Sequence, residues 1–209
     1  MEIAAAYDEW SHSYETNENR TRDLAAKVLR QQYPTLAHRD VLEIGCGTGL
    51  NTQHLVAVSS RVLAVDFSPG MLERARANLD ATNIEFAQLD LQQEWQIATS
   101  LFDLVVCTLV LEHIADLEHV FRETARVLRA SGEFFFCELH PFRQLLGRQA
   151  QFTDEKGGVV RVTAYLHNLS EYVNTSVSQG FEIIRLDEWH DEGSESSPRL
   201  LSLRLRKRE

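Results

Sequence analysis

Several features that define other classes of protein are missing from this 209-residue sequence. No apolar stretch approaches the roughly 20 residues that a membrane-spanning helix needs. The formal net charge of −10 leaves no basic stripe for a general nucleic-acid surface. The amino-terminal segment carries acids where a signal peptide carries basic residues, which favours a cytoplasmic protein. We therefore expect neither a membrane nor a nucleic acid among its partners.

Cysteine is also scarce. Cys46, Cys107 and Cys137 are odd in number and form no C-x-x-C pair, so we expect three separate, mostly buried thiols and no disulfide or metal site. What remains is ordinary for a globular protein, with 44% apolar and 25% charged residues. Residues 1–209 are predicted to form a single domain, as a monomer or a homodimer.

From residue 40 the sequence alternates between strand-like and helix-like segments. Helices are expected over 50–58 and 117–128, the second ended by Gly132, and Ser68-Pro69 is typical of the start of another. The expected strands are 40–45, 61–66, 83–90, 102–110 and 133–139. Repeated β-α units predict a doubly wound, mostly parallel sheet of the Rossmann-like kind, with seven strands in all.

The carboxyl-terminal segments depart from this rhythm. Residues 141–168 are expected to form a two-stranded insertion, and 170–180 a helix with Val173 and Val177 facing inward. Segments 181–189 and 200–206 predict an antiparallel hairpin across the polar loop 192–198. The alternating leucines of the last segment favour an edge strand; they are Leu201, Leu203 and Leu205.

The first 33 residues are predicted to form two helices. Tyr7, Trp10 and Tyr14 recur at helical spacing, and the stripe fits a core face as well as a lid over a site.

Three alternating glycines follow the strand at 40–45, in the stretch VLEIGCGTG. Without a Cβ, such a turn brings backbone N–H groups close to a ligand. No lysine follows, so this is not a phosphate-binding P-loop. The G-x-G-x-x-G dinucleotide fingerprint does not fit either, because Leu50 stands where its third glycine is required.

Acids at two strand ends point to a nucleoside. Asp66 lies 21 residues after Gly45, where a carboxylate can accept both hydroxyls of a ribose. Phe67 offers a flat apolar face for an adenine. Asp90 is placed to accept from an exocyclic amine, although it could be an ordinary turn residue.

The motifs VLEIGCGTG, VDFSPGML, AQLD, FDLVVCTLVLEHI and VLRASGEFFF occur in an order and spacing that resemble a known family. This family is the class I S-adenosylmethionine-dependent methyltransferases, in particular the small-molecule branch that includes ubiquinone- and menaquinone-biosynthesis methyltransferases. The resemblance covers about residues 40 to 140. It reaches the amino-terminal YDEWSHSYE more loosely, because Ser11 replaces the alanine usual in that lid motif.

The resemblance implies a role for each matching position. The glycine turn would pass the methionine portion of the cofactor, Asp66 would hold the ribose, and residues 1–33 would form a lid. The predicted cofactor-binding residues are Tyr14, Glu43, Gly45, Gly47, Asp66, Phe67, Met71, Asp90, Leu91, Cys107 and Thr108. Residues 141–168 would lie near the acceptor, whose predicted contacts are Tyr7, Trp10, Tyr165 and His167.

The acceptor is expected to be a small molecule methylated on oxygen or nitrogen. Apolar residues of the insertion suggest that it has an apolar part, although the insertion fits a dimerisation arm as well; they are Phe142, Leu145, Leu146, Phe152 and Tyr165. A general base is needed only when the nucleophile arrives protonated. His140, held extended by Pro141, ranks first as base, and His113 in LEHI ranks second. No metal is predicted.

Two other functions remain open on the sequence alone. A nicotinamide-dependent oxidoreductase also needs glycines and a ribose-binding acid, but the glycine spacing and Asp90 argue against it. A cofactor-binding module without catalysis would carry the same motifs.

Overall fold

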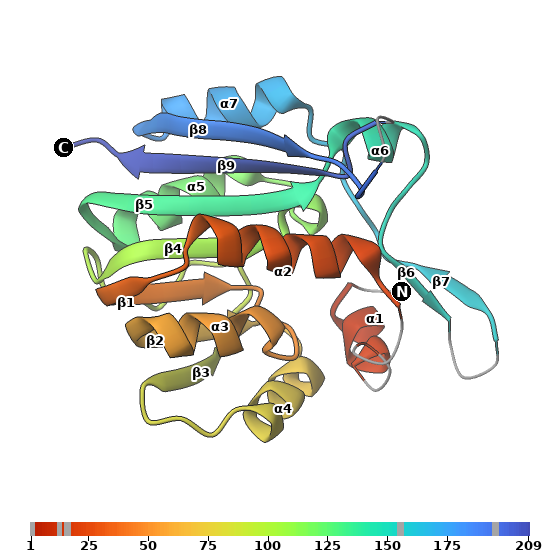
Figure 1. The fold of residues 1–209 in the computed structure, drawn as a ribbon, viewed down its shortest axis with the longest axis horizontal. Helices are drawn as coiled ribbons and strands as arrows, with labels where there is room; N and C mark the ends of the chain where they lie inside the picture. Colours follow the sequence, from red (N-terminus) through yellow and green to blue (C-terminus); the bar gives the residue numbers. More distant parts are fainter. Residues whose placement is uncertain (1–2, 12–13, 15–17, 154–156, 194–196) are drawn as a thin grey trace.

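The computed structural model describes residues 3–11, 14, 18–153, 157–193 and 197–209. Helices and strands alternate through the centre of the chain, as the sequence predicts (Figure 1). In chain order the elements are α1 (Ile3–Trp10), α2 (Arg20–Gln32), β1 (Leu36–Ile44), α3 (Leu50–Val58), β2 (Ser59–Asp66), α4 (Pro69–Asn78), β3 (Ile84–Gln88), β4 (Phe102–Thr108), the short 3₁₀ helix η1 (Leu111–His113), α5 (Leu117–Val127), β5 (Leu128–Leu139), α6 (Pro141–Leu145), β6 (Gln151–Thr153), β7 (Val159–Arg161), α7 (Leu169–Ser178), β8 (Phe181–Trp189) and β9 (Leu200–Lys207).

The main sheet has seven strands in the order β3-β2-β1-β4-β5-β9-β8. Strands β1 to β5 are parallel, whereas β9 is antiparallel to both β5 and β8. The predicted doubly wound sheet with a carboxyl-terminal antiparallel hairpin is therefore confirmed. Within the predicted insertion, β6 and β7 pair as a separate two-stranded antiparallel sheet.

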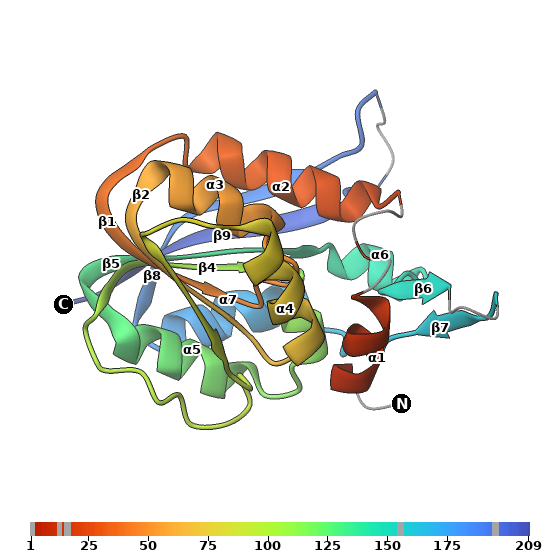
Figure 2. The same ribbon diagram turned by 90° about the horizontal axis from the view of Figure 1, so that it is seen from below.

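Helices cover both faces of the main sheet (Figure 2). On one face α2 and α3 bury Leu29 and Leu55, and on the other α5 and α7 bury Phe121 and Tyr172. A strand covered on both faces must be apolar throughout, because neither row of side chains reaches water. This explains the continuous apolar run of β4, whose residues from Leu104 to Cys107 are all fully buried.

The carboxyl ends of the parallel strands carry the irregular parts of the molecule. Helices α1 and α6 and the β6-β7 hairpin all lie beyond the arrowheads of β1, β4 and β5, whereas the carboxyl terminus lies at the opposite end (Figure 1). In doubly wound sheets this end is where ligands bind, because the loops after the strands form a crevice there.

The end of α5 differs from the prediction. The helix stops at Val127, and β5 begins at once with Leu128, whose N–H donates to the carbonyl of Thr124. Gly132 therefore lies inside β5 and does not end the helix. Ser131 has a positive φ of 59°, and the pairing with β4 shifts register in this part of β5. Gly132 therefore belongs to a bend within β5 and not to the end of a helix.

Strand β9 is an interior strand, which corrects the predicted edge position. It lies between β5 and β8, and Leu201, Leu203 and Leu205 are fully buried. The polar residues between these leucines are hydrogen-bonded to neighbouring strands. Ser202 Oγ accepts from the indole N–H of Trp189 on β8 at 2.8 Å, and Arg204 donates to the carboxylate of Glu133 on β5 at 3.0 Å. The alternation of leucines and polar residues in β9 therefore arises because the polar side chains are hydrogen-bonded on one face of the sheet, not because the strand lies at an edge.

Helix α7 is rotated relative to the prediction. Val177 is 46% exposed, whereas Tyr172, Thr175 and Ser176 are buried. The ring of Tyr172 packs against that of Phe136 with centroids 5.2 Å apart, and this large contact sets which face of the helix turns inward. Val173 is partly buried against the core, as predicted.

The cysteines, the lengths of the helices and the loop 192–198 bear on three further expectations. All three cysteines are buried and free, as predicted. No described helix is long and apolar enough to cross a membrane. The polar loop 192–198 does join β8 to β9, although its residues 194–196 lie outside the described residues.

The interior position of β9 generates a stability prediction. Leu203→Ala should lower the free energy of unfolding by about 2–5 kcal/mol, because it leaves a cavity between Phe136 and Leu186, its partners across β5 and β8. Leu186→Ala on the edge strand β8 is the matched control, since Leu186 is 36% exposed. It should cost less than about 1 kcal/mol in urea denaturation. Equal losses for the two variants would contradict the interior position.

Candidate active site

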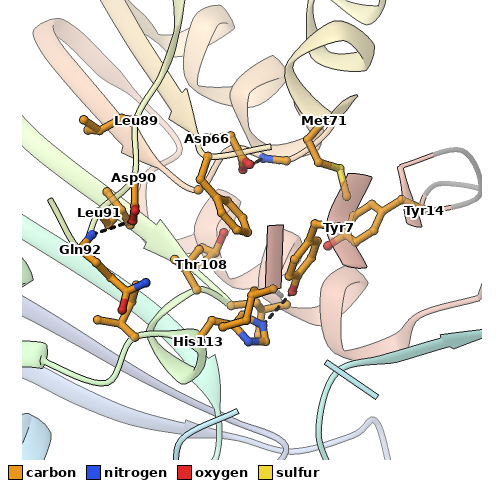
Figure 3. A pocket seen from close by; sticks show the side chains of 17 residues that line it. Tyr7, Tyr14, Asp66, Met71, Leu89, Asp90, Leu91, Gln92, Thr108 and His113 are labelled. Atoms are coloured by element: carbon orange, nitrogen blue, oxygen red, sulfur yellow. Dashed lines mark hydrogen bonds between the residues drawn. The ribbon is translucent and has the colours of Figure 1, made fainter. Parts of the chain in front are cut away.

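Two cavities meet at the carboxyl ends of the parallel strands. The first, of about 90 Å³, is narrow, and the second, of about 530 Å³, has the size of a small-molecule site. Tyr7, Tyr14 and Leu109 line both cavities and so form the wall between them. The first cavity is lined by Ile3, Tyr7, Tyr14, Gly45, Gly47, Asp66, Phe67, Met71, Leu89, Asp90, Leu91, Gln92, Thr108, Leu109, Val110, His113 and Ile114 (Figure 3).

The glycine turn after β1 forms one wall of the first cavity. Gly45 has a φ of +72°, and a Cβ there would lie 2.2 Å from Cγ2 of Val110, so a larger residue would clash. Gly47 also has a positive φ, of +54°, and its N–H donates to Oδ2 of Asp66 at 2.9 Å. The sequence therefore needs glycine here for conformation and for close approach.

Asp66 connects this turn to α4. While Oδ2 accepts from Gly47, Oδ1 accepts from the N–H of Ser68 at 2.9 Å. Burial raises the pKa of Asp66 to about 6, against the opposing effect of these backbone hydrogen bonds. The carboxylate is consequently ionised at neutral pH and retains lone pairs for a ligand.

Most of the predicted nucleoside-binding residues lie on the same cavity. Phe67 and Met71 follow Asp66 in the sequence and line the cavity with it, and Asp90 and Leu91 lie across the cavity from Met71 (Figure 3). Met71 is only 1% exposed, so it belongs to the core as well as to the cavity wall. Asp90 lies two residues beyond β3, and its Oδ1 accepts from the N–H of Gln92 at 3.0 Å, which also makes it a turn residue.

Glu43 does not line either cavity. It is 1% exposed, and its Oε2 accepts from the hydroxyl of Thr52 at 2.6 Å. Burial raises the pKa of Glu43 to about 8. Cys107 is likewise fully buried, with Sγ 3.8 Å from Oε1 of Glu138. Neighbouring Thr108 lines the first cavity and accepts from the side-chain amide of Asn51 at 2.8 Å.

Helix α1 is fixed over the first cavity by a capping carboxylate. Oδ1 of Asp8 accepts from the N–H of Gly70 at 3.1 Å and from the hydroxyl of Ser68 at 2.5 Å, at the first turn of α4. A carboxylate is favoured there by the partial positive charge of a helix amino terminus. The side chain of Ser68 accepts from the N–H of Met71, as predicted for a cap.

The aromatic stripe of the amino-terminal segment divides its contacts between core and cavities. Trp10 stacks on Phe152 of β6 with centroids 5.2 Å apart, and it lines the second cavity. Tyr7 and Tyr14 line both cavities. All three residues of the stripe thus pack in a small core cluster and also line a cavity.

His113 is the histidine that the structure brings to the first cavity. Its Nδ1 lies 2.7 Å from the carbonyl oxygen of Thr163, which can only accept, so Nδ1 carries the proton. In the neutral ring Nε2 then accepts from the hydroxyl of Tyr7 at 2.8 Å (Figure 3). Burial raises the pKa of Tyr7 well above its usual range, so Tyr7 remains a donor at neutral pH.

His140 lies outside both cavities. It caps α6, its Nδ1 accepting from the N–H of Phe142 at 3.1 Å, and its Nε2 lies 2.9 Å from a carboxylate oxygen of Glu188. His167 is also outside, buried with its ring nitrogens on Ile114 O and Glu171. Tyr165, which is 39% exposed, lines neither cavity.

The second cavity is lined mostly by polar residues, and the apolar residues of the insertion named in the sequence analysis lie elsewhere. Phe152 packs on Trp10, and Phe142, Leu145 and Leu146 are about half exposed or more. The cavity lining includes none of Phe142, Leu145, Leu146 and Phe152. Its lining residues are Tyr7, Trp10, Tyr14, Glu18, Asn19, Arg20, Thr21, Leu109, Glu112, Leu139, Arg143, Arg148, Gln149, Ala150, Gln151 and Arg199. The arginines among them were missed because they come from segments far apart in the sequence.

Buried acids lie beneath this part of the molecule. Glu138 is fully buried, and burial raises its pKa to about 8; its Oε1 accepts from the N–H of Val110 at 3.1 Å. Burial also raises the pKa of Glu112, whose Oε1 lies 3.9 Å from Nε2 of His113. Among the described residues, no group of three or more histidines, cysteines or acids could hold a metal ion.

The raised pKa of Glu43 generates a pH prediction. In the unfolded chain this carboxyl titrates near 4.5, and in the folded protein near 8. The folded state therefore binds more protons between these values, and the stability that Glu43 contributes is lost as pH rises from about 4.5 to 8. Relative to Glu43→Gln, which keeps an acceptor for Thr52, the unfolding free energy should fall by up to about 1.4 kcal/mol per pH unit in this window.

Urea denaturation between pH 5 and 8 measures this difference. Glu73→Gln, at an exposed position of α4, provides the control and should leave the pH dependence unchanged. A constant difference between the natural protein and Glu43→Gln across the window would contradict the raised pKa.

Comparisons with known proteins agree with this geometry. Residues 42–136 match the family model described as a methyltransferase domain. An uncharacterised methyltransferase of Emericella nidulans is 27% identical over 229 aligned residues, which cover 90% of this chain and 78% of that protein. A ubiquinone biosynthesis O-methyltransferase of Xanthomonas oryzae pv. oryzae is 29% identical over 107 residues, 50% of this chain and 45% of the relative.

The chain thus spans less than half the length of the ubiquinone-biosynthesis relative. Among solved structures, the DhpI–SAH complex has a TM-score of 0.75 at 24% identity, covering 99% of this chain and 95% of that chain, a likeness of fold. The resemblance that the motifs predicted is confirmed: residues 42–136 match a methyltransferase domain, and the chain resembles S-adenosylmethionine-dependent methyltransferases in sequence and in fold.

Proposed function

We propose that this protein transfers a methyl group from S-adenosylmethionine, bound in the first cavity, to an oxygen or nitrogen of a small molecule in the second. The observation that carries the proposal is the shared wall. Tyr7, Tyr14 and Leu109 line both cavities, so a cofactor in one and an acceptor in the other would meet there.

The residues of the first cavity suit this cofactor. Asp66 would accept the two ribose hydroxyls, Phe67, Met71 and Leu91 would flank the adenine, and Asp90 would accept from its amine. The glycine turn would pass the methionine portion. The cavity is narrow because α1 covers it, so entry of the cofactor requires an outward movement of α1 from its hydrogen bonds on α4.

When bound, the cofactor supplies a methyl group on a positively charged sulfur, ready for in-line displacement. The protein contributes alignment and exclusion of water, which together can lower much of such a barrier. Asp66 lines the first cavity and is ionised at neutral pH, which favours a positively charged cofactor.

His113 is the candidate general base. Its Nε2 lone pair points to the hydroxyl of Tyr7, so a proton from the acceptor would reach Nε2 either directly or through Tyr7. The carbonyl of Thr163 would hold the ring in the required tautomer. His140 is a weaker candidate than its place in the sequence suggested, because both of its ring nitrogens have partners outside the cavities.

Methylation on oxygen is the first form to test. The ubiquinone-biosynthesis relative is named as an O-methyltransferase, and a neutral histidine suits the deprotonation of a phenol or alcohol. We also propose that the chain acts as one domain, with residues 1–33 as lid and 141–168 beside the acceptor. A net charge of −10 favours a small molecule over a nucleic acid.

A screen of phenols, alcohols and amines for release of S-adenosylhomocysteine tests this function. Turnover with at least one acceptor is expected. Binding of S-adenosylhomocysteine without turnover of any acceptor would favour a binding module. Calorimetric binding of NAD in its place would favour an oxidoreductase.

Asp66 generates a prediction for cofactor affinity. Asp66→Asn should weaken S-adenosylhomocysteine binding by about 2–3 kcal/mol, because it removes a charged acceptor for two hydroxyls. Since the pKa of Asp66 is about 6, the natural protein should also lose affinity as pH falls through 6, and the variant should not. Asp80→Asn, at an exposed position after α4, is the charge-matched control. Affinity within twofold of normal in Asp66→Asn would contradict the ribose assignment.

His113 generates a prediction for turnover with an acceptor that arrives protonated. His113→Gln should lower kcat by about 10²–10⁴-fold with cofactor affinity intact, because it removes the proton acceptor. His119→Gln on α5, outside both cavities, should retain normal kcat. If His140→Gln loses kcat and His113→Gln does not, His140 is the base.

A further inference from the structure

The second cavity has an unusual charge for this protein. The chain as a whole carries a net charge of −10, yet four arginines line this cavity against two glutamates. On the proposed function this cavity holds the acceptor. Its charge therefore bears on what kind of acceptor the protein selects.

Arg143 and Arg199 share a single carboxylate, that of Asp191. Arg199 contacts both oxygens of Asp191, at 2.5 and 2.7 Å, and Arg143 contacts one at 3.2 Å. Two positive charges against one leave an excess positive charge at this wall. Both side chains are held in place, because only 16% of each is exposed.

Further hydrogen bonds fix these two guanidinium groups. Nη1 of Arg199 donates to the hydroxyl of Thr21 at 3.0 Å. Arg143 donates to the carbonyls of Ser197 and Pro198, at 3.2 and 3.3 Å, but its Nη1 has no partner among the described residues. A preorganised donor with a free N–H costs little entropy when it binds an anion.

Arg148 completes this wall. It is exposed, and its side chain has no partner in the described part of the chain. Its backbone N–H donates to the carbonyl of Arg143 at 3.0 Å, which keeps the two residues together. Arg143, Arg148 and Arg199 together form the arginine wall of the second cavity.

A second, independent observation comes from Trp10. Its indole Nε1 is buried and has no partner among the described residues, although the residue lines the second cavity. A buried unpaired N–H is costly, and an oxygen of a bound molecule would satisfy it. The cavity therefore offers neutral as well as charged donors to an oxygen-rich ligand.

Two acids, Glu18 and Glu112, line the same cavity. Glu112 lines it near Tyr7, and its Oε1 lies 3.9 Å from Nε2 of His113. An anion would be disfavoured beside this carboxyl and favoured at the arginine wall. A molecule with an anionic group would thus bind in one orientation, with its other end toward the wall shared with the first cavity.

We propose that the second cavity selects an acceptor with an anionic oxygen group, a carboxylate or a phosphate, which the arginine wall binds while the nucleophile lies near Tyr7 and His113. This inference rests on the proposed function, because it takes the second cavity as the acceptor site. Arginine suits such groups, since its planar fork of donors matches two oxygens at once.

Binding of simple probes tests the selection without requiring methyl transfer. Benzoate, phenyl phosphate and the neutral benzamide would be titrated calorimetrically into the full chain saturated with S-adenosylhomocysteine. We expect at least one anion to bind and benzamide to bind at least tenfold more weakly. Preference between benzoate and phenyl phosphate distinguishes a carboxylate from a phosphate acceptor.

Arg148→Gln should weaken binding of the preferred anion about tenfold, and Arg148→Glu should abolish it. Arg30→Gln is the matched control, because Arg30 is an exposed arginine of α2 outside the cavity. It should leave the affinity within twofold. Since Arg148 is exposed, these variants should fold, and an unchanged melting temperature verifies this.

Equal weakening in Arg30→Gln and Arg148→Gln would show a general charge effect and overturn the proposal, as would equal affinity for benzoate and benzamide. Failure of every anion to bind while neutral phenols are methylated would also overturn it, yet leave the proposed function intact. Failure of S-adenosylhomocysteine itself to bind would instead count against the proposed function.

Discussion

A single carboxylate, that of Asp66, connects the parts from which the site is built. One of its oxygens accepts from Gly47 in the turn after β1, and the other accepts from Ser68 at the start of α4. The same turn of α4 is capped by Asp8 of α1. Helix α1, the glycine turn and α4 are therefore positioned through one short set of hydrogen bonds around the end of β2. Because burial raises its pKa only to about 6, Asp66 keeps its charge at neutral pH.

The division into two cavities follows from where α1 lies. Tyr7 of α1 forms the shared wall with Tyr14 and Leu109, and Trp10 packs the helix against the β6-β7 hairpin through Phe152. Asp66 and Asp90 line the first cavity, whereas four arginines line the second. These opposite charges fit the proposed pair of ligands, a positively charged cofactor and an anionic acceptor, and would bring their reacting ends together at Tyr7.

Much of the fold could be predicted from local patterns. Strand and helix periodicity, the cap at Ser68 and the glycine turn depend on neighbouring residues, so the sequence shows them directly. The predictions were wrong where the local structure depends on a contact with residues distant in the sequence. Gly132 lies in a bend of β5, Val177 is turned outward because Tyr172 packs on Phe136, and β9 is interior because its polar residues have partners across the sheet. The arginine wall has no local pattern, since Arg199 is far in sequence from Arg143 and Arg148 and lines the same cavity only in the folded chain.

A structure of the protein with S-adenosylhomocysteine tests the central claim most directly. The account predicts ribose hydroxyls on the Asp66 carboxylate and a sulfur that faces Tyr7 and the opening to the second cavity. A sulfur turned away from the second cavity, or a nucleoside bound away from Asp66, would contradict it.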